Sequence, residues 1–134
     1  SQVASGGELS RIMLAIKTVL AGRDEIDTLI FDEIDTGISG RTAWKVAEQL
    51  SVLSEAHQVI CITHLPQIAA MADVHFAIEK SSTDDMTITD IRKVADEESL
   101  AELARLLGSD ALTEAALSNA KEMKEQANAF KEAR

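Results

Sequence analysis

Two acidic residues follow a short apolar run in the first third of the sequence. The run covers residues 28–31 and leads directly into Asp32 and Glu33, and a run of this kind predicts a parallel strand buried on both faces. A carboxylate at the end of such a strand can hold Mg²⁺ directly or through a water, and a neighbouring carboxylate can activate an attacking water. Strands of α/β proteins also end in acids that are only solvated, so the pair alone leaves both interpretations open.

Two further groups have the chemistry to meet a ligand. Residues 5–8 (SGGE) precede a helix expected over 8–17. Glycines let the backbone approach a ligand closely, and N–H groups at a helix N-terminus attract anions. The alternative for this segment is a flexible entry into a capped helix. His64 follows a second apolar run, 58–63, where a histidine is either a ligand contact or a satisfied structural residue.

The elements that would position these groups alternate between helices and strands. We expect helices over about 8–17, 41–53, 66–71, 96–107 and from 111 onward, and strands over 28–32, 58–63, 74–79 and about 86–94. The alternation predicts an α/β fold with a layered, mainly parallel sheet flanked by helices, whose ligands bind beyond the carboxyl ends of the strands. We expect one fragment over 1–134, with an α/β lobe over 1–94 and C-terminal helices over 95–134.

Hydrophobic patterns also predict which sides of these elements are buried. The first helix is apolar around much of its circumference and should be buried, and Val74, Phe76 and Ile78 should form the buried side of a strand that turns at 81–85. Asp96 should cap the next helix, which closes at Gly108. The last helix should place a set of apolar residues near one face: Leu112, Ala116, Met123, Ala127 and Phe130.

The composition limits the class of protein. The 134 residues carry a net charge of −10, and DNA binding depends largely on Lys and Arg neutralising phosphates, so this chain is a poor candidate for the main DNA-contacting surface. No apolar run approaches the length of a membrane span, and no signal peptide opens the sequence. The single cysteine, Cys61, lies in an apolar run, which predicts a buried free thiol in a reducing compartment. His57 and His75 are interpreted as structural or surface residues.

The order of the three candidate groups resembles that of ABC-type ATPases. Residues 3–10 (VASGGELS) are similar to the ABC signature motif, residues 29–33 (LIFDE) to the Walker B motif, and residues 62–64 (ITH) to the segment of the switch histidine. The joint occurrence of these motifs in this order is improbable by chance. The resemblance implies the second half of a P-loop ATPase head.

Within this class, the residues of these motifs resemble those of the RecN family of bacterial DNA-repair ATPases. The similar segments are residues 3–11 (VASGGELSR), 31–40 (FDEIDTGISG) and 63–69 (THLPQIA). This family is related to the SMC proteins, and its head domain is split by a long coiled-coil insertion. The resemblance implies the C-terminal part of a head that hydrolyses ATP and acts on DNA double-strand breaks in repair and recombination.

The resemblance implies roles for individual residues. Asp32 would help to hold Mg²⁺, Glu33 would orient or deprotonate the water, and His64 would contact the γ-phosphate of ATP. Four residues would reach the ATP bound on the opposite head of a homodimer: Ser5, Gly6, Gly7 and Glu8. The D-loop between the heads would be formed by Thr36, Gly37, Ile38 and Ser39. Many ABC proteins have Asp at the position of Ser39. We do not assign the role of that Asp to any residue of this chain, including the nearby Asp35.

The phosphate-binding loop is absent from the sequence, since no Gly-x-x-x-x-Gly-Lys-Ser/Thr pattern occurs. The resemblance therefore implies a fragment that is inactive alone and pairs with the N-terminal half of the same head. DNA would be contacted through the full-length protein, in the bacterial cytoplasm and at the nucleoid, without a membrane partner. Two alternatives stay open: a fragment of the nucleotide-binding subunit of an ABC transporter, and a non-catalytic interaction module.

Overall fold

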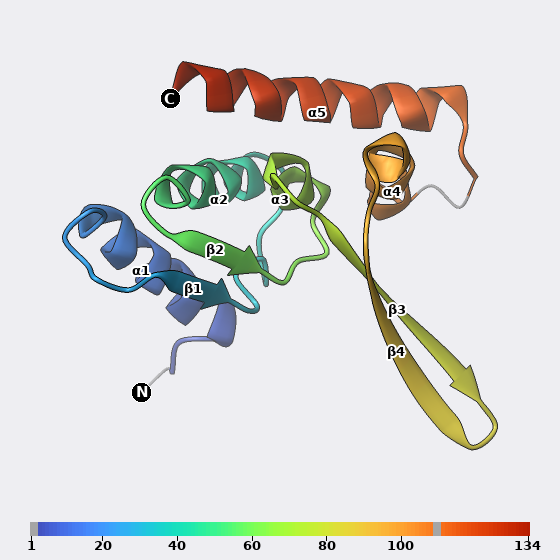
Figure 1. Ribbon diagram of the computed structural model, residues 1–134, viewed down its shortest axis with the longest axis horizontal. Helices are drawn as coiled ribbons and strands as arrows, with labels where there is room; N and C mark the ends of the chain where they lie inside the picture. Colours follow the sequence, from blue (N-terminus) through green and yellow to red (C-terminus); the bar gives the residue numbers. More distant parts are fainter. Residues whose placement is uncertain (1–2, 109–110) are drawn as a thin grey trace.

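The chain folds into helices and strands in the alternating order that the sequence predicts. The computed structural model describes residues 3–108 and 111–134 (Figure 1). Its elements are α1 (Gly6–Val19), β1 (Thr28–Phe31), α2 (Gly40–Leu53), β2 (Gln58–Cys61), α3 (Pro66–Met71), β3 (Phe76–Thr83), β4 (Met86–Lys93), the 3-10 turn η1 (Asp96–Glu98), α4 (Ser99–Leu106) and α5 (Glu114–Ala133). The predicted α/β fold class is confirmed.

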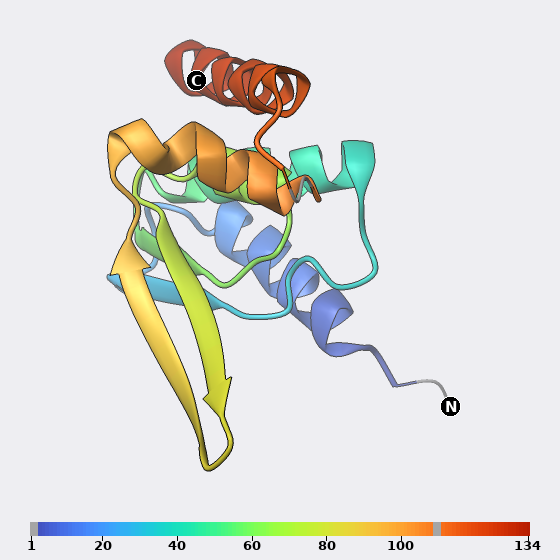
Figure 2. The ribbon, with the colours of Figure 1, turned by 90° about the vertical axis from the view of Figure 1, so that its right-hand side faces the viewer.

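The strands form two small sheets. β1 and β2 pair in parallel, with Thr28 opposite Gln58 and Phe31 opposite Cys61, so the ends of both strands that lead into Asp32 and His64 lie at the same edge. β3 and β4 pair antiparallel as a long hairpin, which extends away from the helices (Figures 1 and 2). In the described part of the chain, no hydrogen-bonded ladder joins the hairpin to β1 and β2.

The hydrophobic core lies between the parallel strands and the helices on one of their faces. α2 and α3 cover that face, and α5 crosses over them (Figure 1). The largest fully buried side chains are those of Ile34, Leu53 and Leu103, which come from the loop after β1, from α2 and from α4. No helix of the described residues is long and apolar enough to span a membrane.

The other face of the parallel strands is uncovered, so the predicted burial on both faces is wrong here. Ile30 and Ile60 are register partners and therefore share this face, and Ile30 is 67% exposed. Phe31, which points to the opposite side, is buried. A parallel sheet normally has both faces covered, and among the described residues no element covers this one.

The first helix is also more exposed than its apolar sequence predicts. α1 buries only Gly7 and Leu14, while its outer side exposes Leu9, Ile12, Met13 and Ile16. The glycines form its first turn instead of preceding it. Ser5 and Glu8 form a capping box that stabilises this first turn. The Ser5 hydroxyl accepts from the N–H of Glu8 at 3.2 Å, and the Ser5 N–H donates to the Glu8 carboxylate at 3.4 Å.

The hairpin corrects the predicted orientation of its first strand. Phe76 and Ile78 are exposed, Val74 before the strand is exposed as well, and Ala77 is buried. The alternation is real but its apolar side faces away from the core, because the hairpin leaves the body of the molecule. Residues 81–83 continue β3, and the turn is limited to Asp84 and Asp85.

The C-terminal helices differ from expectation mainly at their starts. Asp96 does not cap α4: it begins η1, and the N-cap of α4 is Glu98, which makes no side-chain capping hydrogen bond. α5 begins at Glu114, so Leu112 lies before it and is exposed. The rest of the predicted apolar face is confirmed, with two residues buried and two half-buried against the core: Ala116, Ala127, Met123 and Phe130.

Thr113→Ala should lower the free energy of unfolding by about 1 kcal/mol. The Thr113 hydroxyl accepts from the N–H of Ala116 at 3.1 Å and so satisfies one free donor of the first turn of α5. Thr113→Ser keeps the hydroxyl and should stay within a few tenths of a kcal/mol of the parent chain. Urea unfolding of the three chains measures the difference, and equal stability of the Ala and Ser variants would contradict the capping role.

Candidate functional site

The loop after β1 carries the two acids that the sequence singled out. Asp32 and Glu33 are both exposed, and the carbonyl oxygen of Asp32 accepts a hydrogen bond from the Ser10 hydroxyl of α1 at 2.8 Å. Glu33 is the only non-glycine residue in the described ranges with a positive φ, at 60°. Such a backbone costs about 1–3 kcal/mol and is often found at functional sites.

The glycine pair at the start of α1 lies against this loop. A Cβ added to Gly6 would collide with the Glu33 carboxylate, and a Cβ on Gly7 would lie 2.9 Å from both Cβ and O of Thr36. At Gly7 a neighbour is a backbone oxygen, so only a residue without a side chain fits there, whereas at Gly6 the neighbour is the end of a flexible side chain. The structure therefore brings Gly6 and Gly7 together with Glu33 and Thr36 within one chain.

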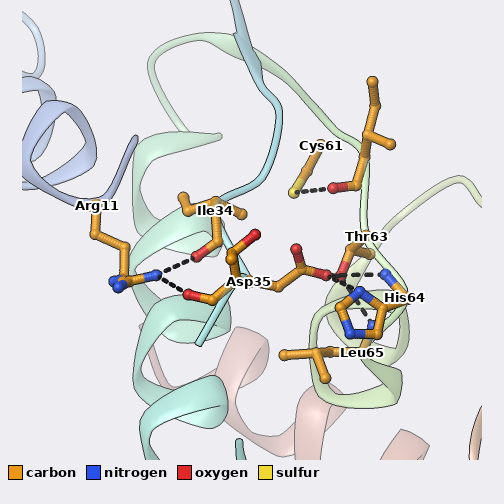
Figure 3. A network of polar contacts seen from close by, with 9 residues as sticks. Arg11, Ile34, Asp35, Cys61, Thr63, His64 and Leu65 are labelled. Atoms are coloured by element: carbon orange, nitrogen blue, oxygen red, sulfur yellow. Dashed lines mark hydrogen bonds and ion pairs between the residues drawn. The ribbon is translucent and has the colours of Figure 1, made fainter. Parts of the chain in front are cut away.

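Arg11 fixes the turn that follows Glu33. Its Nη1 atom donates to the carbonyl oxygens of Ile34, at 3.1 Å, and Thr36, at 2.8 Å (Figure 3). The two carbonyls flank Asp35, so α1 holds the backbone on both sides of this residue. Arg11 was not among the residues that the sequence singled out for a role.

Asp35 connects this turn to the segment after β2. Its side chain is buried, and Oδ2 accepts from the Thr63 hydroxyl at 2.6 Å and from the His64 N–H at 2.9 Å. The same oxygen lies 2.9 Å from Nδ1 of the His64 ring. Burial alone would raise the pKa of the Asp35 carboxyl, but these hydrogen bonds outweigh it and hold the pKa below its ordinary value.

Sequence reasoning left Asp35 without a role, although its pattern carried a signal. An acid three residues after a strand-end Asp, opposite a Thr-His pair at the end of the next strand, supplies an acceptor for several donors at one sheet edge. His64 is placed at that edge as predicted. In the described part of the chain, no hydrogen bond or ion pair joins His64 to Asp32 or Glu33.

The predicted D-loop is a tight turn leading into α2. The N–H of Thr36 donates to the Glu33 carbonyl at 3.1 Å, and Gly37 has φ of 78°, a conformation that glycine adopts without strain. Ile38 packs partly against the core. Ser39 is the N-cap of α2 but makes no side-chain capping hydrogen bond.

The remaining two histidines and the cysteine lie in surroundings that suit a structural role. His57 is buried, with Nδ1 2.5 Å from the Ile26 carbonyl oxygen. Burial lowers the pKa of the half-buried His75 and raises that of the Cys61 thiol to about 12. Cys61 is a free thiol as predicted, but it is partly rather than fully buried. These properties agree with the structural interpretation of all three residues.

A metal ion at this edge would have few protein ligands. Among the described residues no group of three or more His, Cys, Asp or Glu side chains gathers in metal-binding geometry. Mg²⁺ commonly uses one or two carboxylates and completes its shell with substrate phosphates and water. The exposed carboxylate of Asp32 fits that mode of binding.

The α/β fold and the order of these groups along one sheet edge agree with a fragment of an ABC-type ATPase head. Comparison with known sequences makes the relationship more specific. The chain is 46% identical over 131 residues to the DNA repair protein RecN of Bacillus subtilis, 52% identical over 123 residues to that of Treponema pallidum, and 48% identical over 123 residues to that of Deinococcus radiodurans. No protein-family model matches.

These matches confirm the resemblance to RecN. They cover 98%, 92% and 92% of this chain, respectively. The chain spans 23% of the length of the Bacillus subtilis relative and 22% and 21% of the other two. The chain is therefore a relative of one segment of the RecN proteins.

Proposed function

We propose that this chain forms the C-terminal part of the ATP-hydrolysing head of a RecN-like protein that acts in DNA double-strand-break repair and recombination. The observation that carries the proposal is the meeting of three motifs at one loop. Residues 32–36 contact the glycines at the start of α1 on one side and, through Asp35, the Thr63-His64 segment on the other. The sequence similarity to the RecN proteins supports the same conclusion.

In this proposal the strand-end residues act on the nucleotide of their own head. Asp32 would help to hold Mg²⁺, which when bound neutralises charge on the β- and γ-phosphates. Glu33 would orient or deprotonate the attacking water, and its exposed carboxylate is free of any hydrogen bond or ion pair in the described residues. His64 would contact the γ-phosphate, since its ring is held by Asp35 at one nitrogen and is otherwise open to solvent.

The start of α1 would act on the nucleotide of a second head in a homodimer. Ser5, Gly6 and Gly7 lie at the positive end of a 14-residue helix, which is a favourable site for phosphate. Glu8 would support them through its capping-box bonds with Ser5. The turn of residues 36–39 would lie between the two heads.

A partner segment would account for the exposed apolar side chains. The uncovered sheet face exposes Ile30 and Ile60, and the outer side of α1 exposes four further large apolar side chains: Leu9, Ile12, Met13 and Ile16; gathered apolar side chains of this kind often mark an interaction site. We propose that the N-terminal half of the same head covers the sheet face and supplies the phosphate-binding loop. The chain alone would then be inactive, and DNA would be contacted elsewhere in the full-length protein of a bacterial cytoplasm and nucleoid.

The test is ATP hydrolysis by this chain alone and after mixing with a separately expressed segment that carries the phosphate-binding loop. The proposal predicts no turnover above background for the chain alone and turnover in the mixture. The control mixes the same segment with a chain carrying Asp32→Asn and Glu33→Gln. No hydrolysis by a mixture shown to form a folded complex would contradict the proposal and favour an interaction module.

A further inference from the structure

One carboxylate oxygen organises the segment that carries His64. The Asp35 side chain is 4% exposed, and its Oδ2 atom is shared by the Thr63 hydroxyl, the His64 N–H and the His64 ring nitrogen Nδ1. The Thr63 hydroxyl oxygen in turn accepts from the N–H of Leu65 at 3.0 Å. Thr63 and His64 follow β2, 28 and 29 residues after Asp35, so the network ties the ends of both parallel strands together (Figure 3).

This geometry determines which nitrogen of the imidazole carries the proton. An ionised carboxylate only accepts hydrogen bonds, so the nitrogen that faces it, Nδ1, must be the donor. The Nδ1–H tautomer leaves Nε2 as the free nitrogen on a side chain that is 76% exposed. When the ring takes a second proton, Nε2–H can donate to a phosphate oxygen while Asp35 balances the charge on the other side.

Asp35 itself is in no position to touch a substrate. The Asp35 side chain is buried, and Arg11 holds the carbonyl groups of the residues on both sides of it. A carboxylate held in this way keeps the ring that it contacts in one orientation. Its effect on chemistry must therefore pass through His64.

We propose that Asp35 is a positioning residue, which fixes the His64 ring in the Nδ1–H tautomer and presents only Nε2 to a phosphoryl group. The tautomer is a property of this chain by itself, whereas its effect on ATP turnover rests on the function proposed above for His64. The two parts can therefore be tested separately.

The tautomer is tested on the 134-residue chain labelled with ¹⁵N. Two-bond ¹H–¹⁵N correlation spectra distinguish the two neutral tautomers, and the His64 signals are assigned by their loss in His64→Ala. The neutral wild-type ring should be in the Nδ1–H form. Asp35→Ala removes the acceptor oxygen and should shift it toward the Nε2–H form, which imidazole side chains prefer in water. An Nε2–H ring in the wild-type chain overturns the proposal without any variant.

Thr63→Val is the matched control. It removes one hydrogen bond to the same oxygen and weakens the same network, but it leaves the contact between Asp35 and Nδ1 intact. The control should keep the Nδ1–H form. If Thr63→Val changes the tautomer as much as Asp35→Ala does, the hydrogen-bond network as a whole and not the carboxylate sets the tautomer, and the proposal is wrong.

The catalytic consequence is tested in the complex with the phosphate-loop segment. Asp35→Ala should lower kcat about 10- to 100-fold, with little change in KM for ATP, and it should add no further loss in a His64→Ala background. Loss of activity in His64→Ala without loss in Asp35→Ala overturns the positioning role and leaves the proposed function standing. Full activity of His64→Ala instead overturns the proposed role of His64, whatever its tautomer.

Discussion

In the complex of this chain with a phosphate-loop segment, Glu33→Gln should lower ATP turnover by about 10²- to 10⁴-fold while nucleotide still binds. Gln has nearly the same shape and can still hydrogen-bond to a water, but it cannot take the water's proton. The backbone of residue 33 has a φ of 60° in the wild-type chain, and Gln adopts this conformation no less readily than Glu. The expected loss therefore reflects the missing base.

Two measurements separate this effect from a loss of binding or of folding. Equilibrium binding of ATP should be similar for the wild-type and Glu33→Gln complexes, and steady-state hydrolysis should differ. Glu132→Gln makes the same chemical change on an exposed residue of α5 and should leave both quantities unchanged. Turnover by Glu33→Gln at the rate of the wild-type complex would show that Glu33 does not activate the water.

The parts of the fold that sequence analysis predicted well depend on local signals. α3 starts and ends as predicted because Pro66 suits the first turn of a helix, and α2 was placed within one residue. The parallel pairing of β1 and β2 follows from two apolar runs separated by a helix. The acids and the histidine were placed at one sheet edge by the same logic, since parallel strands end on the same side.

The errors in predicted burial have a common physical cause, since burial depends on elements that are distant in the sequence. Ile30 is apolar and belongs to a parallel strand, yet it is exposed because no described element covers its face. Ala77 is buried in place of Phe76 because the hairpin leaves the core. An amphipathic pattern indicates which side of a helix or strand is apolar, but it does not indicate whether another element packs against that side.

The importance of Asp35 could not be derived from its local sequence. Its partners Thr63 and His64 lie 28 and 29 residues further along the chain, and only the parallel register brings them to it. The same holds for Arg11, whose partners are carbonyl groups of a loop that begins after β1. Backbone acceptors have no sequence signature, so the contact becomes visible only in the structure.

Gly7→Ala should lower the free energy of unfolding of the chain by about 1–3 kcal/mol, whereas Gly6→Ala should leave it nearly unchanged. A Cβ on Gly7 would lie 2.9 Å from the backbone oxygen of Thr36 and 3.0 Å from Nη1 of Arg11. Neither a backbone oxygen nor a guanidinium held by two carbonyl groups can move away cheaply. α1 would have to shift from the turn, and the Arg11 hydrogen bonds that hold it would weaken.

Gly6→Ala makes the same substitution one residue earlier, against a partner that can move. The Cβ would meet the far end of the exposed Glu33 side chain, which can rotate into solvent, and Ala favours the helix by up to about 1 kcal/mol over Gly. Urea unfolding should therefore separate the two variants. Turnover in the complex should fall for Gly6→Ala as well, because its methyl group displaces the carboxylate of Glu33. Equal stability of the two variants would mean that the close packing of Gly7 on Thr36 does not hold α1 against the loop.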